Sequence, residues 1–536
     1  MASFFANILI VAFVLLVTSC IPKNKKSGNS ISYNIGGEPT TLSPLSASDG
    51  YTSSIHSYIF EPLLDRDIET FEWKPALASE WEISKDKKVF EFKLREGVKW
   101  HDGKELTAED VKFSYDVMFS DDWKAVQIRP YYESIESVQV IDKFRVRFKV
   151  KDEYFMNFDV CAGLSILPKH FYSNKENKKE FGRKLIGTGP YMLSKYDRGN
   201  KIILVQNPLW WGRNTESEKE TNLIKKINLR MVMEENVFLE LLKKGDLDFQ
   251  GLRPEGFVKK TVGKIWDKKI EKVKTQNKTP KGYSFIAMNL KHPIFKDREV
   301  RKAFSMLFNR PLMLSKFEYN LSEFATGPIY VQSDYSSPVV QPIDFNPDEA
   351  LKILTKAGWS DSDKDGLLDK MINGKKTPFS VTILEPSPDV MKYLTIFKED
   401  ASKIGVEINI KNIEWNSFVK LLDEKNFEAV RLAWGGGGVE WDPKQIWHSS
   451  SIEGASSNFI SYSNPEVDRL IDEARQLHDR DKRISLLRKV HEIISADYPY
   501  IWWFNSKYTL YAHSKRVKKK TDTYQYGIGQ QYWMVK

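Results

Sequence analysis

Residues 431–447 gather side chains that could hold a small ligand. Arg431 offers a planar guanidinium, which can bind a carboxylate through two hydrogen bonds. Trp434, Trp441 and Trp447 offer large flat apolar surfaces against which a ligand can pack. A cationic group beside several indole rings is typical of a binding pocket rather than of a turn.

Four consecutive glycines, residues 435–438, lie in the middle of this segment. Because glycine has no side chain, Gly435 and Gly436 would let a ligand approach the backbone, where free amides and carbonyls could bind a peptide as an added strand. Glu440 and Asp442 follow as candidate anionic contacts. The alternative interpretation is a flexible glycine turn on the surface, with the tryptophans in the core.

Known catalytic motifs are incomplete or missing in this sequence. Residues 97–104 resemble a phosphate-binding loop, but the spacing of the glycines is one residue too long and Glu105 stands where a Mg²⁺-binding Ser or Thr belongs. Residues 527–532 lack the third glycine of a dinucleotide-binding loop. The 8 histidines are scattered rather than clustered as metal ligands. We therefore expect neither a cofactor nor catalytic residues; a secreted hydrolase whose site is assembled in three dimensions is the alternative.

A run of aspartates resembles the start of a calcium-binding loop. Asp361, Asp363, Asp365 and Asp369 follow the spacing of the first nine positions of an EF-hand loop. The twelfth position is Ile372 instead of the usual bidentate glutamate, which argues against tight binding. A solvated loop and a weak calcium site both remain open.

The amino-terminal residues predict export and anchoring. Residues 4–17 form an uncharged apolar run that is too short to span a bilayer and suits a signal peptide, although no Lys or Arg precedes it. Residues 17–20 (VTSC) resemble the lipobox of bacterial lipoproteins, which implies cleavage after residues 1–19 and lipidation of Cys20. The polar residues 20–29 would then form the tether. An uncleaved anchor or a buried free cysteine is the alternative.

The composition excludes several classes of protein. The chain has 536 residues, 41% of them hydrophobic, which is too long for one core and too apolar for a disordered chain. Two cysteines exclude a disulfide scaffold, and Cys161 is expected to be a small buried residue. The net charge of +9 is mild and interspersed, so we expect no nucleic-acid partner. No stretch outside residues 4–17 is long and apolar enough to span a membrane either, so membrane contact should come only through the lipid anchor.

Strand and helix patterns alternate along the chain. Residues 90–94 alternate apolar and charged side chains as a half-buried strand does, and residues 138–150 predict a hairpin. Thr107 predicts a helix start with an acidic residue three positions on, and Asn464 before a proline predicts another. No fixed repeat occurs. These patterns indicate an α/β or α+β protein with several lobes.

Ordered motifs across nearly the whole chain resemble the extracellular solute-binding proteins of family 5, the peptide- and nickel-binding class that serves ABC importers. The motifs are residues 75–81 (PALASEW), 92–103 (FKLREGVKWHDG), 106–111 (LTAEDV), 187–191 (GTGPY), 207–211 (NPLWW), 245–248 (GDLD), 295–304 (FKDREVRKAF), 309–310 (NR), 464–468 (NPEVD), 497–501 (DYPYI) and 516–517 (RV).

The resemblance implies an α/β fold of the two-lobed periplasmic-binding-protein type (type II), with three domains, mixed sheets and a two-strand hinge. Domain I is expected to be discontinuous and domain II inserted in it, with domain III as the second lobe. The expected boundaries are 30–62, 186–275 and 506–536 for domain I, 63–185 for domain II and 276–505 for domain III.

The resemblance also brings Ser48, Asp49 and Tyr51 into the expected site, because a loop at this place contributes polar contacts in related peptide binders. Those proteins usually hold the amino terminus of the ligand with an aspartate four residues before a proline that matches Pro443. This chain has Val439 there. Glu440 or Asp442 would have to replace that aspartate.

We therefore expect a monomeric, lipid-anchored, extracytoplasmic (periplasmic) protein that captures a peptide between two closing lobes and delivers it to the permease of an ABC importer. An oligosaccharide ligand would suit the tryptophans, whereas a nickel chelate fits less well without a histidine cluster. The alternatives are a secreted hydrolase and a protein of the same fold used for sensing.

Overall fold

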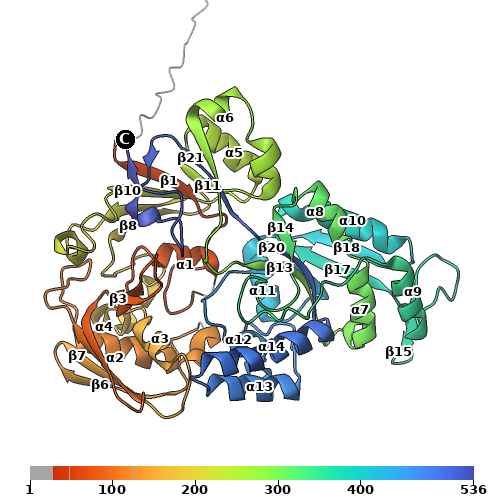
Figure 1. The fold of residues 1–536 in the computed structure, drawn as a ribbon, viewed down its shortest axis with the longest axis horizontal. Helices are drawn as coiled ribbons and strands as arrows, with labels where there is room; N and C mark the ends of the chain where they lie inside the picture. The colour runs from red at the N-terminus through yellow and green to blue at the C-terminus, as the bar shows by residue number, and fades with distance from the viewer. Residues whose placement is uncertain (1–27, 48, 125, 455) are drawn as a thin grey trace, which may run out of the picture.

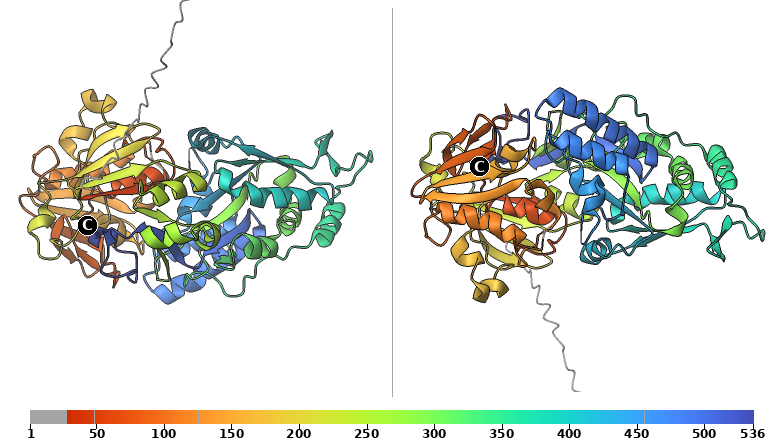
Figure 2. Two further views of the ribbon diagram at one scale, coloured as in Figure 1. Left: turned by 90° about the horizontal axis from the view of Figure 1, so that it is seen from above. Right: turned by 90° about the horizontal axis from the view of Figure 1, so that it is seen from below.

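The structure is a computed structural model that describes residues 28–536 except residues 48, 125 and 455. The described residues form two lobes that lie side by side, as Figure 1 and both views of Figure 2 show. The first lobe holds sheets of seven and four strands, and the second holds a sheet of six strands. The expected signal peptide, Cys20 and Ser48 lie outside the described residues.

The seven-stranded sheet has the order β12-β21-β11-β1-β10-β9-β8. Its strands are β1 (Ser30–Asn34), β8 (Tyr191–Asp197), β9 (Lys201–Gln206), β10 (Lys226–Arg230), β11 (Phe249–Gly251), β12 (Ile270–Thr275) and β21 (Thr509–Ser514). β1 pairs in parallel with β10 and β11, whereas the other described pairs in this sheet are antiparallel. Distant parts of the chain therefore build one mixed sheet.

The four-stranded sheet has the order β4-β5-β7-β6 and confirms the local sequence patterns. Its strands are β4 (Ala78–Ile83), β5 (Val89–Leu94), β6 (Ile135–Asp142) and β7 (Arg145–Val150). The alternation in β5 puts Phe90, Phe92 and Leu94 on the buried face. β6 and β7 form the predicted hairpin, and Asp142 accepts a hydrogen bond from Phe144 N (2.8 Å) at its turn.

The six-stranded sheet of the second lobe has the order β14-β20-β13-β19-β17-β18. Its strands are β13 (Tyr283–Met288), β14 (Ser322–Phe324), β17 (Ser380–Glu385), β18 (Glu407–Asn412), β19 (Ala429–Trp434) and β20 (Tyr500–Ser506). β17 runs parallel to β18 and β19, while β13 is antiparallel to β19 and β20. This sheet is mixed as well, which confirms the expected fold class.

Helices and short strands cover the sheets (Figure 1). In the first lobe these are α1 (Gly50–His56), α2 (Ala108–Asp116), α3 (Asn157–Ala162), α4 (Lys169–Tyr172), α5 (Glu235–Lys244), α6 (Lys264–Lys269), β2 (Leu64–Arg66), β3 (Trp73–Pro75), β22 (Val517–Lys518) and β23 (Met534–Val535). In the second they are α7 (Arg298–Met306), α8 (Arg310–Lys316), α9 (Pro347–Lys356), α10 (Met391–Ser402), α11 (Trp415–Asp423), α12 (Lys444–Trp447), α13 (Pro465–Arg475), α14 (Arg480–Asp497), β15 (Asp369–Ile372) and β16 (Lys375–Pro378). None of the described helices is long and apolar enough to cross a membrane.

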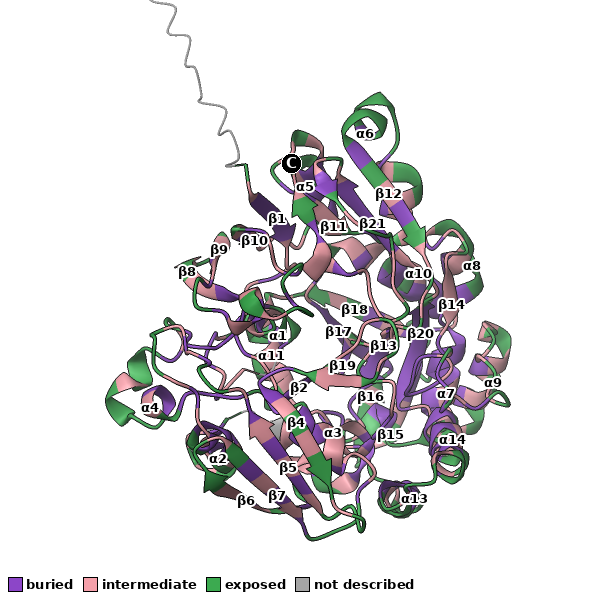
Figure 3. Cartoon of the chain, turned by 60° about the vertical axis from the view of Figure 1, so that its left-hand side comes forward, coloured by how far each residue is buried: buried purple, intermediate pink, exposed green. Residues whose placement is uncertain are grey.

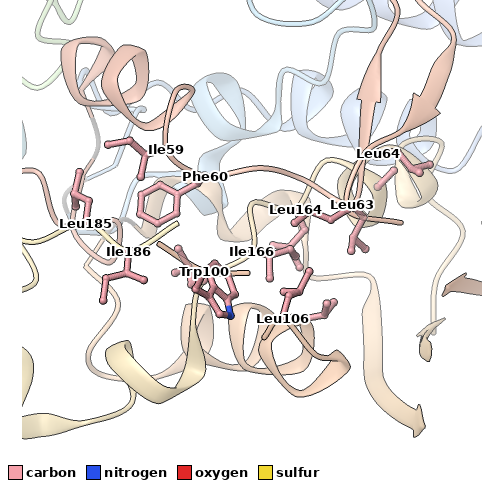
Figure 4. Close-up of a cluster of buried hydrophobic side chains, with 14 of the residues drawn as sticks. Ile59, Phe60, Leu63, Leu64, Trp100, Leu106, Leu164, Ile166, Leu185 and Ile186 are labelled. Carbon is pink, nitrogen blue, oxygen red and sulfur yellow. The ribbon is translucent and has the colours of Figure 1, made fainter. Parts of the chain in front are cut away.

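Each lobe has its own hydrophobic core, as the buried inner strands in Figure 3 show. Figure 4 shows part of the first core, where Trp100 lies near Leu106 and Ile166. Cys161 is buried in the same core without a disulfide, as the sequence predicted. Within residues 92–103, packing thus accounts for Trp100, which is a core side chain.

The chain crosses between the lobes twice. Residues 276–282 connect β12 to β13, and residues 507–508 connect β20 to β21. The buried Lys281 ammonium joins the two crossings, since its Nζ donates to Asn277 Oδ1 (3.0 Å) and to Thr509 Oγ1 (2.9 Å). These two adjacent crossings form the hinge of the fold.

Candidate functional site: a cleft between the lobes

A cleft of about 880 Å³ lies where the two lobes meet the hinge. The first lobe contributes residues 34–36, 50, 51, 54, 250–253, 509 and 510, the second contributes residues 385–387, 415 and 431–433, and the hinge contributes residues 279–282 and 508. A smaller chamber of about 290 Å³ shares Arg253 and Arg431 with it and adds Trp434 and Tyr393. Groups from opposite lobes thus surround one space, which suits a ligand enclosed between them.

Arg431 and Glu385 form an ion pair in the wall of the cleft. Glu385 ends β17 and Arg431 lies on the neighbouring parallel strand β19, so the sheet register brings them together. Arg431 Nε lies 3.7 Å from Glu385 Oε2, with side-chain exposures of 18% and 0%. Burial raises the pKa of Glu385 to about 7 and lowers that of Arg431, although each charge favours the other.

The pair leaves hydrogen-bonding capacity unused. Glu385 Oε1 accepts a short bond from Ser387 N (2.6 Å). Among the described residues, neither Glu385 Oε2 nor Arg431 Nε has a hydrogen-bond partner, which is costly for buried polar atoms. A ligand group that enters between them would recover part of that cost.

Arg253 brings a second guanidinium from the first lobe. It follows β11, and its side chain is 45% exposed at the cleft wall. Its Nη1 lies 3.4 Å from Asp389 Oδ2, and its Nη2 donates to Ser387 Oγ at 3.4 Å. These long contacts join it loosely to the second lobe, so Arg253 remains able to reach a ligand carboxylate.

Tyr51 and Trp415 form an aromatic contact across the cleft. Their ring centroids are 5.3 Å apart at 64°, with Tyr51 from α1 and Trp415 from α11. Gly36 and Gly37 make room for the tyrosine, since a side chain on Gly37 would come within 2.6 Å of the ring. The sequence predicted Tyr51; Trp415 was missed because a single tryptophan at a helix start carries no local signal.

The remaining residues of the Ser48–Tyr51 prediction have structural roles. Asp49 is buried and caps α1: Oδ1 accepts from Thr52 N (2.9 Å), and Oδ2 accepts from the hydroxyls of Thr40 (2.7 Å) and Thr52 (2.9 Å). The expected contact between Asp49 and a ligand is therefore corrected, because its carboxylate oxygens are already occupied. Ser48 lies outside the described residues.

Gly435 and Gly436 do not line the cleft or the smaller chamber. At Gly436 an added Cβ would lie 1.8 Å from the carbonyl oxygen of Pro280, so glycine is required for the segment to pack on the hinge. An added Cβ at Gly435 would meet no atom within 4 Å. Contact with the hinge thus accounts for Gly436 and a left-handed φ of +66° accounts for Gly437, whereas Gly282 of the hinge lines the cleft.

Glu440 was expected to replace the missing aspartate, but the structure places it elsewhere. It accepts hydrogen bonds from Arg480 Nε (2.8 Å) and Arg483 Nη2 (2.6 Å), and from the hydroxyl of Tyr335. Burial acts to raise the pKa of Glu440, but these three donors hold it below its ordinary value. Two arginines already neutralise this carboxylate, so it is not available to a ligand ammonium.

Asp442, the other candidate, is also engaged. It is buried, pairs with Arg475 and accepts a hydrogen bond from the hydroxyl of Tyr154 (2.7 Å). Arg475 also lies over the Tyr154 ring, 4.0 Å from its centroid. Because Tyr154 belongs to the first lobe and Asp442 to the second, this aspartate joins the lobes rather than contacting the cleft.

The tryptophans divide between the cleft and the core. Trp434 lines the smaller chamber. Trp447 is fully buried, 5.0 Å from the Tyr500 ring and 5.4 Å from that of Tyr462. Trp441 is buried beside Tyr335. The expectation that Trp441 and Trp447 form ligand walls is therefore corrected: both are core residues.

The lobes touch on either side of the cleft. At one contact Asp389 Oδ2 accepts from Glu235 N (3.0 Å) at the start of α5. At the other, Phe155 N donates to Arg475 O (2.8 Å), beside the Tyr154–Asp442 bond. The structure thus shows the lobes closed against each other.

The aspartate-rich loop forms a partial cation site in the second lobe. Carboxylate oxygens of Asp361, Asp363 and Asp365 lie within 4.8 Å of one another and are exposed. Asp369 instead binds Ser362 and, with Asp363, the ammonium of Lys376. A lysine in contact with two of the four aspartates competes with a cation, and the arrangement carries no further conclusion.

The fold and the cleft define a two-lobed solute-binding protein. The family model for bacterial extracellular solute-binding proteins, family 5 Middle, matches residues 72–457. The chain therefore belongs to this family. The family membership that the ordered sequence motifs predicted is confirmed.

Individual relatives agree with this placement. The oligopeptide-binding protein AppA of Bacillus subtilis is 29% identical over 496 residues, which cover 90% of this chain and 87% of AppA. The solved structure of AppA with a nonapeptide superposes with a TM-score of 0.82 at 26% identity, covering 95% of this chain and 99% of that one. NikZ of Campylobacter jejuni, solved with Ni(L-His), gives a TM-score of 0.79 at 21% identity and 95% and 100% coverage, which shows the shared fold.

Proposed function

We propose that the chain captures a peptide in the interlobe cleft and delivers it to the permease of an ABC importer. The cleft of about 880 Å³, with Arg253 and Arg431 approaching from opposite lobes, is the observation that carries this proposal. Its volume falls within the range of about 300–1,000 Å³ for small-molecule sites, so a short peptide fits the closed form. AppA, which is similar over most of the chain, was solved with a peptide.

The mode of recognition departs from amine binding by Glu440 or Asp442. Both carboxylates are paired with arginines outside the cleft lining. We propose that Arg253 and Arg431 hold carboxylate or carbonyl groups of the ligand, and that Tyr51 and Trp415 pack against its side chains.

The anchoring and domain division belong to the same proposal. Lipidation of Cys20 after removal of residues 1–19 would hold the protein, as a monomer, at the outer face of a membrane, with residues 20–29 as tether. The proposed domains are 30–62, 186–275 and 506–536 for domain I, 63–185 for domain II and 276–505 for domain III. This division keeps each of the three large sheets in one domain except at the boundary residue Ser506.

Ligand titration tests the proposal. Purified protein is titrated with peptides of two to nine residues while tryptophan fluorescence and heat are recorded, since Trp415 and Trp434 line the cleft. We expect saturable binding without turnover.

Arg253→Ala should weaken peptide binding by about tenfold or more, because it removes one charge-assisted bidentate contact. Arg298→Ala on the surface of α7 should leave the affinity unchanged. Binding of an oligosaccharide or a nickel chelate but of no peptide would overturn the proposed ligand, and hydrolysis would overturn the binding role.

A further inference from the structure

One end of the seven-stranded sheet brings together segments that are far apart in the sequence. β1 and β10 begin together, because Ser30 pairs with Lys226 in a parallel register. β11 runs in the same direction but starts three residues farther along β1, where Phe249 pairs with Tyr33, so the residues just before β11 lead back toward this end. His513 lies opposite both Phe249 and Glu271 in antiparallel registers, so β21 ends there and β12 begins there.

The segments that meet at this end are rich in lysine. Lys225 precedes β10, Lys244 ends α5, α6 ends at Lys269, and the basic residues 515–520 follow β21. We call the following six exposed side chains the basic face: Lys225, Lys244, Lys268, Lys269, Lys515 and Lys518. Figure 1 shows α6, β10, β21 and the carboxyl terminus gathered on one side of the first lobe.

These charges are not neutralised within the molecule. Among the described residues of 28–536, none of the six lysines forms an ion pair. Asp246, Asp267 and Glu271 are acidic side chains at the same end of the sheet, while the nearby Glu220 pairs with Lys520. Six exposed lysines against these three carboxylates leave an excess of positive charge on this face, which would attract an anionic surface.

The amino-terminal segment joins the body at the same face. Ser30 O accepts from Arg516 Nη2 (2.7 Å), Lys225 N donates to Asn29 Oδ1 (3.2 Å), and Lys536 N donates to Arg516 O (3.1 Å). The preceding residues include Lys23, Lys25 and Lys26. Val262 before α6 and Ile265 within it are exposed by 56% and 52%, which adds apolar side chains next to the lysines.

We propose that the basic face lies on an anionic lipid headgroup surface. Lysines near a surface of anionic lipids are attracted within about one Debye length, roughly 10 Å at 0.1 M salt. A lipid at Cys20, ten residues before Ser30 in the chain, would hold this end of the sheet near the bilayer, and the exposed apolar side chains suit the headgroup boundary. The inference rests on the proposed anchoring only for the nearness of the bilayer. The basic face itself consists of residues that the structure describes.

The test compares lysine reactivity of the full-length processed chain on two kinds of vesicle. The protein is mixed with vesicles of phosphatidylcholine alone or with about 30% phosphatidylglycerol, and an amine-reactive ester labels exposed lysines for mass spectrometry. Flotation reports whether the protein stays on the vesicles. We expect the lysines of the basic face to react roughly threefold or more slowly on the anionic vesicles, with recovery at about 0.5 M salt. Lys398 and Lys411, exposed in the second lobe, should react equally on both.

A pair of variants separates the face from total charge. Replacing Lys268, Lys269, Lys515 and Lys518 by glutamine should abolish the salt-sensitive binding, whereas replacing Lys398, Lys411, Lys420 and Lys489, the same change in net charge, should not.

The outcomes distinguish this inference from the proposed anchoring. Flotation with both vesicles and selective protection on the anionic ones supports both ideas. Flotation with anionic vesicles alone supports the basic face and contradicts the anchor. Flotation with both vesicles without a difference in lysine reactivity overturns the basic face and retains the anchor, and flotation with neither overturns both.

Discussion

Glu385 shows how one buried residue couples pH to this fold. Its carboxyl ends β17 with no exposed surface, one hydrogen bond from Ser387 N and Arg431 Nε at 3.7 Å. The distance is too long for a hydrogen bond, so the attraction does not offset the loss of hydration and the pKa rises to about 7. At neutral pH part of the population therefore carries a neutral Glu385.

The raised pKa predicts a pH-dependent stability that Glu385→Gln removes. A carboxyl group with a folded pKa above its unfolded value stabilises the fold below the unfolded pKa, near 4.5, and loses this contribution as pH rises through about 7. Between these limits the unfolding free energy of the native chain should fall by about 3 kcal/mol relative to the variant, which has no carboxyl to titrate.

Urea unfolding of both proteins at pH 5 and pH 7.5 measures this difference. Glu399→Gln, which removes an exposed carboxyl on α10, serves as the control. Equal pH dependence in the native chain and the Glu385 variant would show that the carboxyl titrates normally.

At the scale of elements, α13 illustrates how a local signal stabilises a helix. Asn464 Oδ1 accepts from Glu466 N (3.1 Å) and Val467 N (3.4 Å), and Pro465 occupies the first helical position. Asn464 Nδ2 also donates to Asp497 Oδ2 (3.0 Å), which ties the start of α13 to the end of α14. The cap therefore acts within the helix and between two helices.

Asn464→Ala should lower the unfolding free energy by about 1–2 kcal/mol, because it leaves two amides at the helix start and the Asp497 contact unsatisfied. Differential scanning calorimetry measures the change. Gln476→Ala at the exposed carboxyl end of the same helix is the matched control and should have a much smaller effect. Similar losses in both variants would contradict the role assigned to the cap.

At the scale of the whole molecule, contacts between the lobes determine how readily the cleft closes. The bond from the Tyr154 hydroxyl to Asp442 (2.7 Å) joins the lobes at a distance from the hinge, and Arg475 supports it. The Tyr154–Asp442 bond joins the two lobes and therefore contributes to the closed state, whereas the Asp442–Arg475 pair lies within the second lobe.

Tyr154→Phe should favour the open form. Loss of one hydrogen bond costs about 1 kcal/mol, so ligand affinity should fall by up to about fivefold while the Asp442–Arg475 pair stays intact. Calorimetric titration measures the affinity, and small-angle scattering measures the lobe separation. In the control, Tyr115→Phe removes a bond of similar length to Ile135 O (2.8 Å) within the first lobe, and it should lower stability without changing affinity. An unchanged affinity in Tyr154→Phe would contradict this account of closure.

The sequence by itself determined the family, the mixed α/β class, the β6–β7 hairpin and the caps at Thr107 and Asn464, because these depend on short-range periodicity and on ordered motifs. It also singled out Arg431, Trp434 and Tyr51, which the structure places around the cleft and its smaller chamber.

Only the tertiary structure decided how the other candidates are used. Glu440 pairs with Arg480 and Arg483. Asp442 pairs with Arg475 and accepts a hydrogen bond from Tyr154, 288 positions away, so both carboxylates are neutralised outside the cleft. Arg253 and Trp415 reach the cleft by the packing of the lobes. Local spacing contains no information about such partners, because a side chain's charge and accessibility depend on which distant segments fold against it.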